Sequence, residues 1–408
     1  ANCSKPKQYK SGRGVMRAAL WLAVATAQDV AFRVGFGSCV NQLRRSRALE
    51  RASTEKPHAF VFLGDNVYHD MPSCGIPWSH ERCSARDWLQ VLRRVGTFLF
   101  RVATQGPAAE DSSRRTDDYD AFSRDHVAPF MARSPDTQLF ATWDDHDYGR
   151  DDAGEEYVYK NDSRRQFLQF WNRSTSREGI FESGLLEKNG KTVHVIVLDT
   201  RWSRTAWLRA AWGDRMLKIA TMLRDELFGT RPTVCPPEAD RGFQREPRML
   251  SEEQWRWLEE QLHREADLTI VASSVQVLRP KSGGLEGWSL MPRERQRLLH
   301  LLRGRVVILS GDVHYGELSA SDGVVELTSS GLTETWPCAH PNPLRVGTVV
   351  HAPNFGLVDL LADGTVRLAL RDAQGNDRLV HTLPSAPEDP PSAPEEDTCA
   401  ALGEAQCP

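Results

Sequence analysis

The sequence predicts a layered α/β fold, and three observations carry this prediction. Short apolar runs rich in β-branched and aromatic residues recur along the chain, segments with a helical period lie between them, and a hairpin pattern stands near the end. Apolar strands that alternate with amphipathic helices are typical of sheets buried on both faces. Five runs are expected to be strands: 32–36, 59–63, 193–198, 268–273 and 306–310.

Two helices are expected in the second half of the chain. Ser251 and Gln254 fit a capping box, which marks a helix start. The apolar residues that follow fall on one face of that helix: Trp255, Leu258 and Leu262. A second helix is expected directly after Pro292.

The C-terminal part predicts a hairpin and then a solvated tail. Segments 355–360 and 365–370 are joined by Ala362-Asp363-Gly364, a turn sequence that suits two antiparallel strands. Between Pro384 and Asp397 the chain carries five prolines and five acidic residues, a composition that cannot form a packed core. We therefore expect the folded domain at 28–382 and a Pro- and acid-rich tail at 383–408.

Residues 1–27 read as an N-terminal extension that contains a secretory signal peptide. Met16-Arg17 precedes an apolar stretch at 18–25, and Ala25-Thr26-Ala27 fits a cleavage site near Ala27. The alternative is a buried N-terminal strand or helix. The signal predicts a secreted, periplasmic or lumenal protein. No apolar run approaches the roughly 20 residues that cross a bilayer, so we expect no transmembrane segment.

The charge balance disfavours one class of function. Lys and Arg total 51 and Asp and Glu total 55, which gives a net charge of −4. A nucleic-acid binder is expected to carry a basic stripe. We therefore expect no nucleic-acid binding, although nucleotides remain possible substrates.

Polar residues gather in four segments, at least three of which directly follow an apolar run: Gly37-Ser38-Cys39, 64–68, 143–147 and 310–314. Ligands of open α/β sheets collect outside the carboxyl ends of strands, so the four segments are expected to converge. They supply carboxylates, two imidazoles, a thiol and a phenol, which would repel one another without bound cations. Each segment alone has a plainer alternative: a turn, a solvated acidic loop, a strand-to-turn transition, or a buried or disulfide-bonded Cys39.

In this order, the first three segments, with the third extended to 143–149, resemble the alkaline phosphatase D (PhoD-like) family of metallophosphoesterases. Further motifs that match in the family's order are 198–201, 254–258, 310–314 and 326–332, so the resemblance spans roughly residues 32–375. It implies a metallophosphatase-type α/β sandwich of two mixed β-sheets flanked by helices, with 28–382 as the catalytic domain.

The resemblance also implies the site. Asp65 would bridge two metals and take part in catalysis, and His146 would act as the leaving-group acid or charge stabiliser. The implied ions are Fe³⁺ and Ca²⁺, with other divalent ions as alternatives. Asp312 and His314 are expected on one extended segment, two residues apart and able to reach one metal cluster. The implied metal ligands are Cys39, Asp65, Tyr68, Asp144, Asp145, Asp312 and His314.

The function that follows is metal-dependent hydrolysis of small phosphate esters by a metal-activated hydroxide. The nearest alternative is phosphodiesterase or phospholipase D-type hydrolysis at the same site. The other alternative is a secreted, calcium-stabilised binding protein without catalysis.

Two segments depart from the family pattern. Asn66 stands where some members carry a phosphate-binding arginine, and Arg150 or Arg201 would have to compensate, unless Arg201 only braces Asp199. The basic and aromatic residues that family members carry before this tryptophan are missing before Trp288. Trp288 itself would either line the substrate pocket or pack in the core.

The cysteine count leads to a disulfide prediction. If Cys3 is removed with the signal and Cys39 is held by metal, six cysteines remain, and an exported chain tends to oxidise them. Six cysteines allow 15 connectivities. Proximity favours Cys74–Cys83 and Cys399–Cys407, which leaves Cys235–Cys338; the alternative is that some stay reduced or pair between chains.

Overall fold

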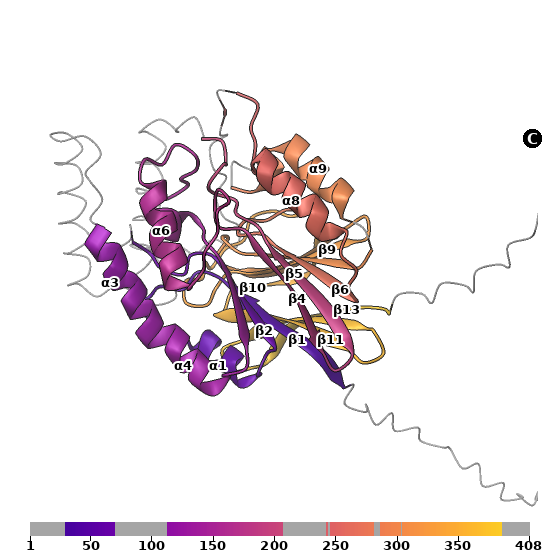
Figure 1. Cartoon of the computed structure of the whole chain (residues 1–408). Coiled ribbons are helices and arrows are strands. Elements are labelled where there is room, and N and C mark those ends of the chain that lie inside the picture. Colours follow the sequence, from indigo (N-terminus) through magenta and orange to yellow (C-terminus); the bar gives the residue numbers. More distant parts are fainter. Residues whose placement is uncertain are drawn as a thin grey trace, which may run out of the picture.

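The computed structural model describes residues 29–69, 112–206, 242–243, 245–280, 286–302 and 304–385. Two mixed β-sheets lie face to face, and helices cover their outer sides (Figure 1). This is the metallophosphatase-type sandwich that the resemblance implied.

The first sheet has six strands in the order β13-β12-β11-β1-β2-β3. Strands β1, β2 and β3 run parallel, whereas β11, β12 and β13 are antiparallel to their neighbours. Their bounds are Val30–Gly37 (β1), Ala59–Leu63 (β2), Gln138–Thr142 (β3), Asn354–Leu361 (β11), Val366–Asp372 (β12) and Asp377–Leu383 (β13).

The second sheet has seven strands in the order β10-β8-β9-β7-β6-β5-β4, of which β5, β6, β7 and β9 are parallel. The remaining pairs are antiparallel. Their bounds are Glu182–Lys188 (β4), Lys191–Val197 (β5), Leu268–Ala272 (β6), Val306–Ser310 (β7), Gly316–Ser321 (β8), Val324–Ser329 (β9) and Arg345–Val350 (β10).

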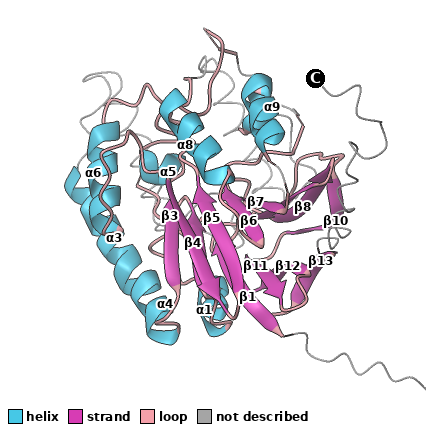
Figure 2. Ribbon diagram, turned by 45° about the vertical axis from the view of Figure 1, so that its right-hand side comes forward, coloured by secondary structure: helices cyan, strands magenta, loops and turns pink. Residues whose placement is uncertain are grey.

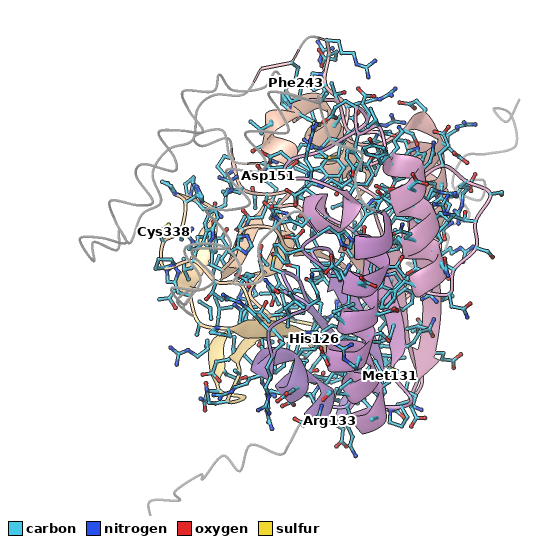
Figure 3. The ribbon with its side chains drawn as sticks, turned by 90° about the vertical axis from the view of Figure 1, so that its left-hand side faces the viewer. His126, Met131, Arg133, Asp151, Phe243 and Cys338 are labelled. Carbon is cyan, nitrogen blue, oxygen red and sulfur yellow. The ribbon has the colours of Figure 1, made fainter. Side chains whose placement is uncertain are left out.

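The helices form the outer layers (Figure 2). On the side of the first sheet lie α1 (Arg47–Thr54), α3 (Ser112–Phe122), the π-helical turn η1 (Ser123–Val127), α4 (Ala128–Arg133) and α6 (Lys160–Phe170). On the side of the second lie α8 (Glu252–Leu262), the 3₁₀ turn η2 (Trp288–Leu290) and α9 (Pro292–Leu301). Figure 3 shows the molecule from the side of α3 and α4 and labels Met131 and Arg133 of α4 and the buried His126 of η1. The short helix α5 (Asp145–Tyr148) follows β3.

Strand β2 shows how the sequence fills the layers. All five of its residues are buried. Ala59, Val61 and Leu63 face the core between the sheets, whereas Phe60 and Phe62 face the core under the helices. Because successive side chains of a strand point to opposite faces, a continuous apolar run can serve both cores. Burial on both faces is therefore confirmed.

The expected elements are confirmed, with one difference in detail. The five apolar runs are β1, β2, β5, β6 and β7, and the predicted hairpin is β11–β12, in which Leu360 faces Val366. Ser251 caps α8 by accepting from the backbone N–H of Gln254, 3.1 Å away. The Gln254 side chain does not return to Ser251. It bonds both backbone groups of Asp199 instead, at 2.8 and 2.9 Å, and so ties α8 to the end of β5.

Several predictions fall outside the described residues. The signal sequence and nearly all of the acidic tail lie there, so the proposed domain limits stay predictions. Of the six cysteines in the predicted pairs, only Cys338 is described, so the pairing also stays a prediction. Within the described ranges, no helix is long and apolar enough to cross a bilayer.

Candidate metal centre

The four polar segments converge, as predicted, at the carboxyl ends of β1, β2, β3 and β7. Their side chains form overlapping groups in which the potential ligand atoms all lie within 4.8 Å of one another. One group is Cys39, Asp65 and His314; together with Tyr68 we call it the thiol side. Another is Asp144, Asp145 and Asp312, which we call the carboxylate side. Asp65 also groups with Asp145 and His146, so it links the two sides.

On the thiol side, a thiol and a phenol meet at one carboxylate. The Cys39 Sγ lies 3.6 Å from Asp65 Oδ2, and the Tyr68 hydroxyl donates to the same oxygen at 3.1 Å. Ser330 lies 3.0 Å from the Cys39 Sγ and accepts from the backbone N–H of His314 at 2.7 Å. The end of β9 therefore holds two segments that are far apart in the sequence.

The backbone at the centre is unusual. Cys39, Asp65, Asp312 and His314 have φ angles of 64°, 49°, 71° and 59°, in the left-handed region that non-glycine residues seldom adopt. Such conformations persist only where the surroundings impose them, and they cluster at functional sites. Here the Cys39 and Val40 N–H groups donate to the carbonyls of Gly64 and Asp65 at 3.3 and 2.8 Å. These bonds join the turns after β1 and β2.

This backbone corrects one expectation. Asp312 and His314 do not lie on an extended segment, because both have positive φ. Their side chains accordingly separate: His314 groups with the thiol side and Asp312 with the carboxylate side. The two-residue alternation of a strand does not apply in this turn.

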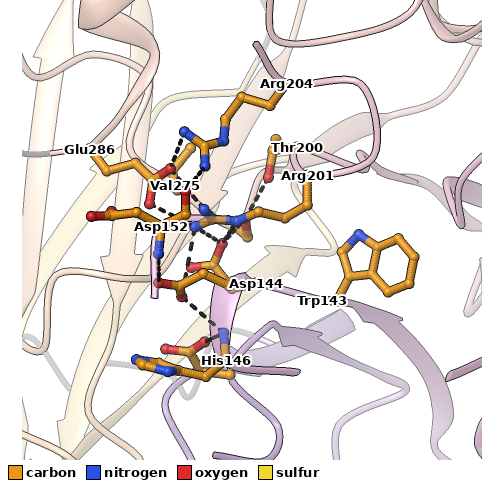
Figure 4. Close-up of polar contacts among 12 residues, drawn as sticks. Trp143, Asp144, His146, Asp152, Thr200, Arg201, Arg204, Val275 and Glu286 are labelled. Atoms are coloured by element: carbon orange, nitrogen blue, oxygen red, sulfur yellow. Dashed lines mark hydrogen bonds and ion pairs between the residues drawn. The ribbon is translucent and has the colours of Figure 1, made fainter. Parts of the chain in front are cut away.

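The carboxylate side is built at the start of α5. Asp145 accepts from the backbone N–H groups of His146 and Asp152, at 3.1 and 2.7 Å. Asp144, the N-cap residue of α5, accepts at Oδ1 from Arg201 Nε at 2.6 Å and from Ser274 at 2.7 Å (Figure 4). Its other oxygen, Oδ2, is buried and has no hydrogen-bond partner among the described residues.

His146 lies between the two sides. Its backbone N–H donates to Asp145 Oδ1 and lies 3.4 Å from Asp65 Oδ1. Its ring packs on that of Tyr68, with 4.5 Å between the centroids. The imidazole is therefore within reach of anything bound at Asp65.

Burial disfavours the charged forms of the acidic groups at this centre. Burial, together with neighbouring acids, raises the pKa values of Cys39, Asp65 and Tyr68 well above their usual range. Burial and Asp144 do the same for the pKa of Asp312. A bound cation favours the charged forms and reverses such shifts.

The donor set fits metal ions. Carboxylate and phenol oxygens suit hard cations, and the thiol and imidazole add ligands for a transition metal. Burial lowers the pKa of His314 to about 3, so its ring is neutral, the form that binds metal. The unpartnered Oδ2 of Asp144 is a further acceptor within the site.

Sequence reasoning missed Glu286, whose carboxylate receives two arginines. Arg201 donates to it from Nη1 and Nη2, both at 2.8 Å, and Arg204 lies 2.9 Å away. A carboxylate placed between apolar and glycine residues, just before Trp288, was the available signal.

The departures from the family pattern also find their places. Arg201 is fully buried, and its backbone rather than its side chain binds Asp199, at 2.9 Å. Arg150 pairs with Glu156 at 3.3 Å near the surface. Asn66 donates to Asp147 Oδ2 at 2.6 Å and so braces α5. Trp288 is a core residue: it is fully buried and donates to Ser273 at 3.0 Å.

Cys39 is a buried free thiol. This agrees with the prediction that left Cys39 out of the disulfide pairs.

The fold is of the metallophosphatase type, and the donor cluster lies at the ends of its strands. The family model described as PhoD-like phosphatase matches residues 186–376, which include Asp312 and His314. This match confirms the resemblance and supports a hydrolase of phosphoric esters. The motifs around Cys39, Asp65 and Asp145 lie outside the matched segment.

Solved structures share the fold. The structure of PhoD matches with a TM-score of 0.56 and 13% identity, over 89% of this chain and 73% of that chain. GAP50, the anchor in the inner membrane complex of Plasmodium, matches with a TM-score of 0.50 and 12% identity, over 88% of this chain and 91% of that chain. No curated protein matches in sequence.

Proposed function

We propose that this chain hydrolyses small phosphomonoesters at a centre with Fe³⁺ on the thiol side and Ca²⁺ on the carboxylate side. The observation that carries the proposal is the convergence of six potential ligands from four strand ends, with Asp65 common to two groups and with Tyr68 bound to Asp65 as a seventh. A thiol, a phenol and an imidazole suit a ferric ion, and three carboxylates suit calcium.

When bound, the two cations would hold phosphate oxygens and lower the pKa of a water toward neutral. Residues of the chain position the two cations and assist the departure of the alcohol. Asp65 offers one oxygen to each side, which fixes the spacing of the two sides. His146 lies beside Asp65 and donates a proton to, or stabilises the charge on, the departing alcohol. No protein nucleophile takes part.

Comparing two chromogenic substrates tests the substrate class. We expect higher kcat/KM for p-nitrophenyl phosphate than for bis(p-nitrophenyl) phosphate. The reverse order would favour the phosphodiesterase or phospholipase D-type alternative at the same site. Iron and calcium should each be found in the purified protein by elemental analysis; a fully active protein without iron would contradict the assignment of the thiol side.

A non-catalytic role remains the second candidate, because GAP50 has the same fold and is described as an anchor. This alternative predicts bound calcium with no hydrolysis of any phosphoester. Under our proposal, chelation abolishes turnover and metal restores it. If metal stabilises the protein but the protein hydrolyses no phosphoester even before chelation, the result would favour the non-catalytic binding protein.

The proposal includes export and oxidation. N-terminal sequencing of the secreted protein should find Gln28 first, and peptide mapping without reduction should find Cys235 linked to Cys338. A disulfide at Cys39 would overturn both the pairing and the role of Cys39 at iron.

A further inference from the structure

We propose that Arg201 and Glu286 form a buried clamp that holds Oδ1 of Asp144 and leaves Oδ2 as the atom that binds the cation of the carboxylate side. This inference rests on the proposed function. It makes Arg201 and Glu286 positioning residues for one metal, rather than residues that touch the substrate.

The arginine side chain is fully engaged by carboxylates. Its Nε donates to Asp144 Oδ1 at 2.6 Å, and its Nη2 forms an ion pair with the same oxygen. Its Nη1 and Nη2 meet the two oxygens of Glu286 in a two-pronged pair. Since Arg201 has no exposed surface, it cannot take the place of a phosphate-binding arginine (Figure 4).

A second donor fixes the same oxygen of Asp144. Ser274 donates to Oδ1 at 2.7 Å and is itself 2.5 Å from the Thr200 hydroxyl. Two donors on Oδ1 fix the plane of the carboxylate, whereas Oδ2 is buried without a hydrogen-bond partner in the described ranges. A buried carboxylate oxygen without a partner is costly. A cation among Asp144, Asp145 and Asp312 would satisfy it.

The clamp acts mainly on one side of the centre. Arg201 pairs with Asp144 and lies 3.8 Å from Asp145, both on the carboxylate side. Partners that orient a metal ligand typically change metal affinity when they are altered. Lysine would keep the charge of Arg201 but not the fork that joins Asp144 to Glu286. We therefore expect the clamp to set calcium affinity and to leave iron in place.

Calcium titration of the full-length protein tests the clamp. After EGTA treatment, Ca²⁺ is titrated by calorimetry into wild type, Glu286→Gln and Arg201→Lys. We expect the affinity to fall about 10-fold for Glu286→Gln and about 100-fold for Arg201→Lys. Iron content should stay unchanged, and saturating Ca²⁺ should restore kcat.

The matched control is Asp359→Asn, which removes the carboxylate from another, partly buried arginine pair. Arg33 meets Asp359 at 2.6 and 2.9 Å in the first sheet. We expect this variant to lose thermal stability and to bind Ca²⁺ like wild type. Arg201→Lys leaves two buried carboxylates poorly paired, so if it does not fold, Glu286→Gln decides.

Three outcomes would overturn the clamp: wild-type Ca²⁺ affinity in a folded Glu286→Gln protein, equal losses of affinity in the control, or loss of iron together with calcium. A wild type that binds Ca²⁺ and loses affinity as expected, yet hydrolyses no phosphoester, would support the clamp and count against the proposed function.

Discussion

The two sides of the metal centre hold their acidic groups in different ways. On the carboxylate side, a buried arginine neutralises Asp144 and itself pairs with Glu286. On the thiol side, hydroxyl groups and left-handed turns hold Cys39 and Asp65. The comparison indicates that the carboxylate side is partly balanced by the protein, whereas the thiol side depends more on its metal.

Asp65→Asn is expected to cause the largest loss, because this residue belongs to both sides. Removing a shared ligand should cost roughly 4 kcal/mol of transition-state stabilisation, or about 1000-fold in kcat/KM. Kinetics on p-nitrophenyl phosphate and elemental analysis measure the effect. Asp359→Asn serves as the control. A loss no larger than that of Tyr68→Phe would show that Asp65 serves one side alone.

His146→Ala should come next, with kcat about 100-fold lower and metal content nearly unchanged. Esters with good leaving groups should lose less, because they need little protonation. Comparing p-nitrophenyl phosphate with phenyl phosphate measures this difference. Loss of metal from the variant would instead make His146 a ligand.

Tyr68→Phe tests the thiol side alone. An iron-bound phenolate should give the wild type a visible charge-transfer band, and the variant should lose that band. Since Asp65 and Cys39 remain, turnover should fall only about 10-fold. The visible absorption spectrum and the turnover rate of wild type and variant measure these two effects. A wild-type protein that is colourless, contains no iron and is fully active would contradict the assignment of iron to the thiol side.

The smallest expected effect is a pH dependence of the metal-free protein. Burial raises the pKa values of Asp144 and Asp147 to about 7, so the folded state keeps protons that the unfolded chain releases above about pH 4. Stability from these groups is full below that pH and is lost as the pH rises toward 7. In EGTA, Tm should fall on the order of 5 °C between pH 4.5 and 7.5.

Added Ca²⁺ should reduce that fall, because a cation favours the charged form of Asp144. Asp322→Asn, at an exposed turn, should leave the curve unchanged. A Tm that rises with pH in EGTA would contradict the predicted protonation of the carboxylate side.

Much of the fold could be predicted from local pattern. Strands β2 and β7 agree residue for residue with the apolar runs 59–63 and 306–310. The helix after Ser251 begins at its cap. Strand β4, in which no residue is fully buried and Leu185, Glu187 and Lys188 are exposed, gives no comparable signal. It is placed by pairing with β5. Long-range pairing is not encoded in a local window.

The candidate ligands could be named in advance because a strand followed by Asp, His or Cys is a local feature, and the resemblance put those features in order. The division of these ligands between the two sides could not be predicted. It depends on the left-handed turns at Asp312 and His314, which place the two side chains on different sides of the centre.

The apolar runs, the helix caps and the residue types of the site are properties of the sequence read a few residues at a time, because period and chemistry act locally. The clamp depends on the folded chain. Arg201 meets Asp144 across 57 positions and Glu286 across 85, so packing alone brings these charges together. Burial of that kind removes water from many segments at once, and it turns an ordinary arginine into a support for a metal ligand.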